Sequence, residues 1–169
     1  MPDQRPFKLY LDTSIINFAI SAQSVEKEKR ITLNLLSQIE QGKFEGYISD
    51  IVVLEIKKTP DEKRQQALLN EIRNRPSLQN IWSNRQAENL AEKYIAEGII
   101  PVRYRDDALH IAIATINHLD IVVSWNFEHL VKSKTRREVQ GVNTLMGYHF
   151  IDIATPTEVI ENEGTAAHA

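Results

Sequence analysis

The sequence predicts an α/β protein with three layers, in which helices cover both faces of a central parallel sheet of four to five strands. Short apolar runs rich in strand-forming residues, such as 7–11 and 121–124, alternate with longer segments whose apolar residues recur at helical spacing. The run 121–124 lacks the apolar–polar alternation of a half-exposed strand, which is typical of strands buried on both faces. Strands that alternate with helices favour a parallel sheet, because each helix packs back onto the sheet between two strands.

The composition indicates one globular domain and excludes several classes of site. A chain of 169 residues with 42% hydrophobic and 25% charged residues can bury a substantial core. We expect residues 1–163 to form a single domain and residues 164–169 to form a disordered tail. A formal charge of −3 does not indicate a broad nucleic-acid-binding surface, although a local basic stripe or a metal ion can supply that attraction. The absence of cysteine excludes disulfides, thiolate catalysis and cysteine-based zinc sites.

The sequence contains no apolar segment of the kind that targets or anchors a protein to a membrane. No stretch near the start has the apolar core of a signal peptide, and no run approaches membrane-spanning length. We therefore expect a cytoplasmic protein with no membrane partner.

The N-terminal half predicts two strands and three helices. They are a strand at 7–11, a helix at 30–41 stopped by Gly42, a strand at 44–49, a helix at 51–56 capped by Ser49 and Asp50, and a helix from Thr59 to Arg75 closed by Pro76. The last helix is expected to start with Thr59 as N-cap, because Pro60 then takes the first position and Glu62 follows three residues after the cap.

The C-terminal half continues the alternation. We expect a short edge strand at 78–82, a helix begun by the capping box of Ser83 and Gln86 and ended by Gly98, a helix at 106–114, strands at 121–124 and 150–153, and a short helix capped by Thr155. The alanines of 106–114 allow close packing on the sheet. The basic stretch 132–137 and the mixed segment 142–148 carry no assigned element.

Acidic residues fall at comparable places relative to the predicted strands and helices. Asp12 ends the first strand, Glu55 interrupts an apolar helix, Asp106 and Asp107 open another, and Asn126 and Glu128 follow the strand at 121–124. Each has a simpler explanation: Asp12 as a helix cap, Glu55 on a solvent-facing turn, and the two aspartates at the positive end of a helix. Ligands of open parallel sheets gather at the carboxyl edge, where these side chains would meet. Converging carboxylates repel one another, and oxygen ligands of this kind favour Mg²⁺ or Mn²⁺.

The order of these residues resembles the PIN-domain family of small metal-dependent ribonucleases, which includes VapC-like toxins of toxin–antitoxin pairs. The matching segments are Leu9–Ser14, Ser49–Ile56, Asp107–Ala114 and Val123–Phe127. Each motif is short, but four in the family's order, with agreeing strand and helix contexts, are considerably more specific. The resemblance covers residues 8–153 and implies a PIN-like fold.

The resemblance implies a role for each residue of the motifs. Asp12, Glu55 and Asp107 would be the catalytic residues and would bind Mg²⁺ or Mn²⁺, with Thr13 or Ser14 orienting Asp12 or a water. A metal-activated water would then attack an RNA phosphodiester. Asn126 stands where many family members have a fourth acid, which puts a second tightly bound metal in doubt, although its amide oxygen can still act as a ligand.

Two further acids are candidates for completing the site. Asp106 or Glu128 would compensate for the missing charge at Asn126. We favour an arrangement in which Asp106 caps its helix while Asp107 turns inward.

Basic and aromatic residues flank the motifs. Arg103, Arg105, Lys132 and Lys134, with Arg136 and Arg137 beside them, would form a phosphate-binding rim, or an ordinary solvated face. Trp125 and Tyr104 are candidates for base stacking, although Trp125 fits a core position better. His110 and His129 are candidates for proton transfer, but the sequence shows no partner for either, which favours structural roles.

Three hypotheses follow. The first is a Mg²⁺- or Mn²⁺-dependent endoribonuclease, the toxin partner of a small antitoxin and a homodimer by analogy with small ribonucleases of this kind. The second is an inactive PIN-fold module that binds RNA or a protein, which Asn126 favours. The third is a signalling receiver-type domain with Asp50 as phosphoacceptor, a scheme that leaves Asp106 and Asp107 without a role.

Overall fold

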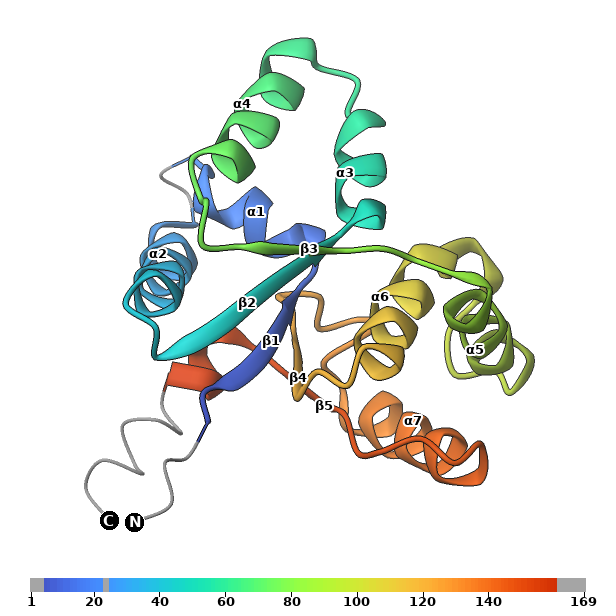
Figure 1. Ribbon diagram of the computed structural model, residues 1–169. Coiled ribbons are helices and arrows are strands. Elements are labelled where there is room, and N and C mark those ends of the chain that lie inside the picture. Colours follow the sequence, from blue (N-terminus) through green and yellow to red (C-terminus); the bar gives the residue numbers. More distant parts are fainter. Residues whose placement is uncertain (1–4, 23–24, 161–169) are drawn as a thin grey trace.

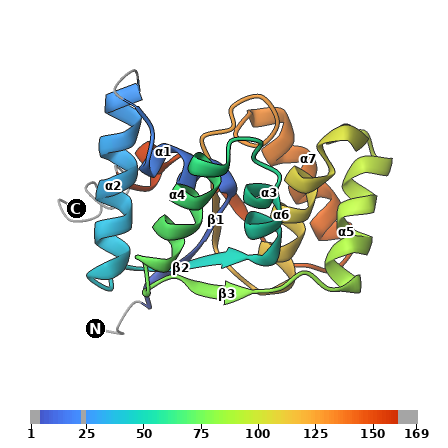
Figure 2. The same cartoon turned by 90° about the horizontal axis from the view of Figure 1, so that it is seen from above.

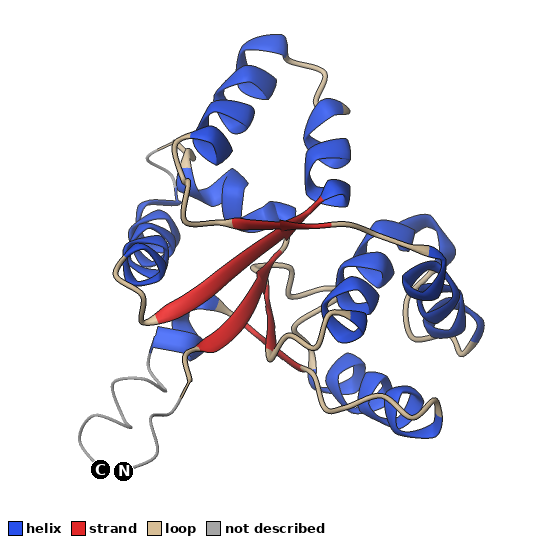
Figure 3. Cartoon of the chain, viewed as in Figure 1, coloured by secondary structure: helices blue, strands red, loops and turns tan. Residues whose placement is uncertain are grey.

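A parallel sheet of five strands forms the middle layer, as the sequence predicts (Figures 1 and 3). The computed structural model describes residues 5–22 and 25–160. The strands are β1 (Phe7–Leu11), β2 (Phe44–Ser49), β3 (Gln79–Ile81), β4 (Ile121–Val123) and β5 (Asp152–Ala154). They lie in the order β3-β2-β1-β4-β5, and every neighbouring pair is parallel.

Helices cover both faces of this sheet, which completes the three-layer α/β/α fold. They are α1 (Thr13–Ala19), α2 (Glu26–Glu40), α3 (Asp50–Lys57), α4 (Glu62–Arg73), α5 (Arg85–Ala96), α6 (Arg105–Ile116) and α7 (Ser133–Leu145), with a 3₁₀ turn η2 (Val102–Tyr104) before α6. Helices α1, α2 and α4 lie on one side of the sheet and α5, α6 and α7 on the other (Figures 1 and 2). Residues 156–160 are helical as well.

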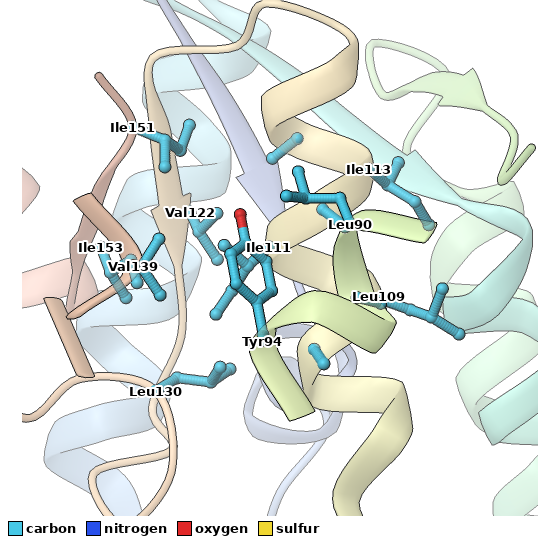
Figure 4. Close-up of a cluster of buried hydrophobic side chains, with 14 of the residues drawn as sticks. Leu90, Tyr94, Leu109, Ile111, Ile113, Val122, Leu130, Val139, Ile151 and Ile153 are labelled. Carbon is cyan, nitrogen blue, oxygen red and sulfur yellow. The ribbon is translucent and has the colours of Figure 1, made fainter. Parts of the chain in front are cut away.

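Each face of the sheet has its own hydrophobic core. Tyr94, Ile111 and Val122 belong to the core under α5, α6 and α7, where side chains from three helices meet those of the sheet (Figure 4). The other core contains Leu9 and Leu35 and packs α1, α2 and α4 against the sheet. Strand β1 contributes to both, since Tyr10 faces the first core and its neighbours Leu9 and Leu11 face the second, so Asp12 follows a strand whose last three residues are buried.

The strand order places a topological switch point beside Asp12. The chain builds β1, β2 and β3 outward in one direction and then returns to place β4 on the other side of β1. At such a switch point the connections leave the two strands in opposite directions, and ligands of open α/β sheets bind at the carboxyl ends there. The order also excludes the receiver-type hypothesis, because that fold arranges its strands 2-1-3-4-5.

Several predicted helix starts are displaced. Helix α2 begins at Glu26, four residues before the expected position, because its first turn is polar and adds nothing to the apolar periodicity. Helix α4 is capped by Asp61 rather than Thr59; the Asp61 carboxylate accepts hydrogen bonds from two first-turn amides at 3.0 and 3.3 Å. Helix α5 is capped by Asn84 rather than Ser83, since Asn84 accepts from an amide of the first turn at 2.9 Å.

Helix α7 was not predicted. It spans the basic stretch 132–137 and part of the mixed segment 142–148. Its buried face contains Thr135, Val139 and Val142, too few apolar residues to reveal a helical period among many charged ones.

The end of the described chain agrees with prediction in type but not in every boundary. Strand β5 starts two residues after the predicted 150, and Phe150 is exposed. Thr155 caps the final helical segment, accepting from the Glu158 amide at 3.2 Å. The predicted tail 164–169 lies outside the described residues, and within those residues no helix has the length and apolar content needed to cross a membrane.

Candidate functional site

Asp12 is buried at the carboxyl end of β1 and is held through both carboxylate oxygens. Its Oδ1 accepts hydrogen bonds from the backbone amide (3.1 Å) and the hydroxyl of Ser14. Its Oδ2 accepts from the hydroxyl of Ser124, directly after β4. The bond to the Ser14 amide makes Asp12 the N-cap of α1, so the cap and site interpretations describe one side chain. The carboxylate is therefore fixed across the switch point between β1 and β4.

Glu55 extends from α3 and is held by residues of two other helices. Thr13 Oγ1, at the start of α1, donates to Glu55 Oε1 at 2.9 Å. His110 Nε2, on α6, makes a second hydrogen bond to the same oxygen. The alternative of a solvent-facing turn is thus wrong, because the Glu55 side chain is only 27% exposed and contacts these partners.

Asp107 and Asp106 take different directions from the first turn of α6. Asp107 is partly buried and accepts a hydrogen bond from Asn126 Nδ2 at 3.3 Å. Asp106 lies 3.6 Å from Lys58 Nζ and is 38% exposed. The expected division is correct for Asp107, but Asp106 is not the helix cap: Tyr104 occupies that position, without a side-chain cap.

The electrostatic environment separates these carboxylates into two kinds. Burial raises the pKa of Asp107 to about 6, and repulsion from Asp12 and Glu55 adds to this effect. Burial likewise raises the pKa of Asp12, although His110 and the hydroxyl donors oppose the shift. These two groups therefore carry a repulsion that a cation would relieve.

Glu55 and His110 instead form a compensated pair. Burial disfavours the ionised Glu55 carboxylate, but the hydrogen bond and charge of His110 outweigh it and lower the pKa of Glu55. In the same way, burial disfavours protonated His110, but Glu55 outweighs it and raises the pKa of the imidazole. Both shifts favour a carboxylate–imidazolium pair beside the repelling aspartates.

Asn126 faces Asp107 with its nitrogen. Its Oδ1 accepts from the His129 backbone amide at 3.1 Å, which fixes the amide orientation, and its Nδ2 points to Asp107. In this orientation Asn126 offers a hydrogen-bond donor rather than the metal-ligating oxygen that the resemblance implies. Glu128 is exposed, and its carboxylate lies 3.8 Å from the ring of its neighbour His129, which is not one of the carboxylates of the site.

The site includes Ser124 and Tyr10, which the sequence did not single out, and His110, for which the sequence favoured a structural role. Ser124 binds Asp12, His110 binds Glu55, and Tyr10 supports His110 through a hydrogen bond of 2.6 Å from its hydroxyl to Nδ1. The available signal was polar residues in apolar elements: a histidine inside α6 and a tyrosine inside β1. Since a lone polar residue in a core is usually satisfied locally, that signal did not reveal the partners.

The predicted RNA-binding residues differ in whether other side chains already pair with them. Arg105 pairs with Glu92, whereas Lys132 and Lys134 are exposed near the start of α7. Arg103 is exposed and its guanidinium lies 5.0 Å from the centre of its neighbour's ring, that of Tyr104.

The two aromatic candidates for base stacking also differ. Trp125 is buried and its Nε1 donates to Thr32 at 2.8 Å, which gives it the wall position that the sequence favoured. Tyr104 stacks on His129, with ring centres 3.8 Å apart.

The chemistry of the site fits a hard divalent cation only in part. Asp12 and Asp107 supply carboxylate oxygens, the ligands that Mg²⁺ and Mn²⁺ prefer, and Mg²⁺ is often held by one or two carboxylates with water. Within residues 5–22 and 25–160, however, no three histidine or acidic side chains are arranged as a ready metal-binding group. Glu55 is not a free third ligand, because its Oε1 already makes hydrogen bonds with Thr13 and His110.

Comparison with known proteins identifies the fold. No protein-family model and no curated protein matches the sequence. Among solved structures, a chain of VapBC2 from Rickettsia felis, bound to a DNA fragment from their promoter, matches with a TM-score of 0.57 and 17% identity over 88% of this chain and 98% of that one. A chain of DNA-bound VapBC from Salmonella typhimurium gives a TM-score of 0.49 and 18% identity over 89% and 98%. The first likeness, together with the sheet order and helix layers, shows that this chain has the PIN-like fold to which its four motifs point.

Proposed function

We propose that the protein is a divalent-metal-dependent endoribonuclease and the toxin of a toxin–antitoxin pair. The observation that carries this proposal is the meeting of Asp12, Glu55 and Asp107 at the switch point of the sheet, where two of the three carboxylates have raised pKa values. Burying mutually repelling carboxylates opposes folding, so a site of this kind is typical of function rather than of structure.

The acidic residues of the site would have different roles in the reaction. Asp12, oriented by Ser14 and Ser124, and Asp107 would hold Mg²⁺ or Mn²⁺. The ion, when bound, would neutralise charge on an RNA phosphate and lower the pKa of a water. Glu55 would orient that water by accepting a hydrogen bond from it, because its carboxylate is held in place and its lowered pKa keeps it ionised.

The basic residues would position the RNA backbone. Arg103, Lys132 and Lys134 are exposed and would contact phosphates, with an affinity that falls as salt rises. A small antitoxin of the kind found in VapBC complexes would be the protein partner, and the active form would be a homodimer. The likeness to a chain of the R. felis VapBC2 complex supports a partner of this class.

Cleavage of single-stranded RNA tests the proposal. The purified protein should cut RNA with Mn²⁺ or Mg²⁺, and EDTA should stop the reaction. Asp12→Asn and Asp107→Asn should abolish cleavage while circular dichroism shows a folded protein. Asp152→Asn is the matched control, because Asp152 begins β5 at the opposite, amino edge of the sheet. Folded wild-type protein that shows no metal-dependent cleavage would refute the proposal. Cleavage by the two site variants at the wild-type rate would refute it as well.

A second candidate is an inactive PIN-fold module that binds RNA or a protein. Asn126 favours it, since its nitrogen rather than its oxygen faces Asp107. Calorimetric titration with Mn²⁺ separates the two functions: the enzyme should bind the ion and lose it in Asp12→Asn, whereas a binding module should bind none. RNA binding without Mn²⁺ binding would select the module.

A further inference from the structure

A buried chain of polar groups runs beneath the carboxylates and ends on Glu55. Ser49 Oγ lies 2.7 Å from the hydroxyl of Tyr10, and that hydroxyl lies 2.6 Å from His110 Nδ1. His110 Nε2 then contacts Glu55 Oε1. Ser49, Tyr10 and His110 are each 1% exposed or less, so no solvent competes for these hydrogen bonds. The chain connects the ends of β2 and β1 to α6 and, through Glu55, to α3.

The chemistry of the chain fixes the direction of its last bond. An ionised carboxylate has no proton to give, so His110 Nε2 carries a hydrogen and donates it to Glu55. Nδ1 is left to pair with Tyr10, whose hydroxyl can donate or accept. When the ring is neutral, Tyr10 donates to Nδ1; when the ring is charged, Nδ1 donates to Tyr10. Rotation of two hydroxyls thus satisfies His110 in either state, and the ring need not move.

The long side chain of Glu55 needs such support. A free glutamate loses considerable rotamer entropy when it is fixed in one position. Here Thr13 contacts it from α1 on one face of the sheet, and His110 contacts it from α6 on the other. Asp12 has a comparable support in Ser14 and Ser124, whereas Asp107 has only the bond of 3.3 Å to Asn126.

We infer that His110 is a positioning residue that fixes the Glu55 carboxylate at the catalytic edge, with Tyr10 and Ser49 as its buried support. The role rests on the proposed ribonuclease function and adds a residue outside the acidic set. His110 touches Glu55 rather than the reacting atoms, so it acts through that carboxylate. Loss of a partner that orients an active-site carboxylate typically lowers activity about 10- to 100-fold.

Two substitutions of similar size separate positioning from packing. The amide of glutamine reaches about as far as His110 Nε2 and can still donate to Glu55, whereas the shorter asparagine reaches only the region of Nδ1. His110→Asn should therefore lower the cleavage rate about 10- to 100-fold, and His110→Gln should restore much of it. The same pair at His149, whose ring contacts the Leu119 carbonyl (3.0 Å) before β4, is the matched control and should show no such difference.

A double-mutant cycle tests whether His110 acts through Glu55. If it does, His110→Asn should have little further effect once Glu55→Gln is present, because the two residues form one unit. Additive effects in the cycle would overturn the inference. Tyr10→Phe removes only the supporting hydroxyl and keeps the ring, so it provides the same test if His110→Asn does not fold: its cleavage rate should fall, and an unchanged rate would count against the inference.

Proton NMR gives a readout that needs no activity. A buried imidazole N–H that donates to a carboxylate exchanges slowly and resonates far downfield. Wild-type protein should show this signal from His110, and Glu55→Ala should remove it while a His149→Gln spectrum keeps it. Absence of the signal in folded wild-type protein would overturn the inference.

The two readouts distinguish the possible failures. Wild-type cleavage with equal rates for the asparagine and glutamine variants of His110 overturns the positioning role and leaves the ribonuclease standing. A wild-type protein that cleaves no RNA but shows the protected imidazole proton overturns the ribonuclease and supports the contact between His110 and Glu55.

Discussion

Replacement of Asp107 by asparagine should stabilise the ion-free protein while it abolishes cleavage. Burial, with repulsion from Asp12 and Glu55, raises the pKa of Asp107 from 3.8 to about 6. A carboxyl group whose pKa is raised by folding favours the folded state only when protonated. Its ionisation therefore penalises folding above pH 6, and the penalty disappears as the pH falls through 6 toward 3.8.

The size of the effect follows from the pKa. Each pKa unit corresponds to about 1.4 kcal/mol, so ionised Asp107 disfavours the folded state by up to about 3 kcal/mol. Asparagine removes the charge and can still accept the hydrogen bond from Asn126 through its amide oxygen. In a chain of this size, a gain of that order would raise Tm by up to about 6–12 °C.

Urea unfolding across the pH range is the assay. The free energy of unfolding of Asp107→Asn should exceed that of wild type at about pH 8, and the difference should shrink toward about pH 4. Mn²⁺ should stabilise wild type and have less effect on the variant, because the ion binds only the folded site.

A neighbouring aspartate supplies the control. Asp106→Asn should change the free energy of unfolding by less than about 0.5 kcal/mol, since Asp106 is 38% exposed and its pair with Lys58 at 3.6 Å is weak. An Asp107→Asn protein less stable than wild type at high pH, or a gain that does not depend on pH, would show that burial and repulsion do not act on this carboxyl as described.

Two other predictions concern packing and RNA affinity. A methyl group at Gly46 would lie 2.8 Å from Leu78 Cδ2. Gly46→Ala should therefore lower the free energy of unfolding by about 1–3 kcal/mol in urea titrations, with an unchanged m-value. A variant as stable as wild type would contradict the close packing. Arg103→Ala should weaken RNA binding and reduce the slope of log K against log salt concentration by about 0.7 per lost phosphate contact. Arg105→Ala should change both quantities less, because Glu92 already pairs with Arg105. The opposite order in filter-binding assays would argue against this arrangement.

The fold was predictable from sequence wherever periodicity was strong. Strand β1 and the strand at 121–124 are short apolar runs, and α5 carries apolar residues at regular helical spacing. Helix α7 was missed because its inward face is small and its remaining residues are charged or polar. The capping residues were misplaced by one or two positions because Thr59, Asp61, Ser83 and Asn84 are all good N-caps. Ser83 instead donates from its amide and hydroxyl to Asp50, a contact that the local sequence does not reveal.

The members of the site were largely predictable, but their partners were not. The acids were recognisable from their places in the chain: Asp12 follows the first strand, Glu55 interrupts an apolar helix and Asp107 opens another. The topology of a parallel sheet brings such positions to its carboxyl edge. The contact between Glu55 and His110 joins residues 55 positions apart on two helices, and no local pattern encodes it. Likewise, the orientation of Asn126 depends on the His129 amide, a feature of the folded loop rather than of the motif.

Charge balance at the site bears on how many ions it would hold. With His110 protonated, its positive charge offsets Glu55, and Lys58 offsets Asp106 at 3.6 Å. Among the described residues, Asp12 and Asp107 have no ion-pair partner of their own, and burial raises the pKa of both even though the charge of His110 opposes the shift. One divalent cation would neutralise them, whereas a second would face a site without further free charge. An acid in place of Asn126 would supply that charge, so the amide at this position favours a single ion.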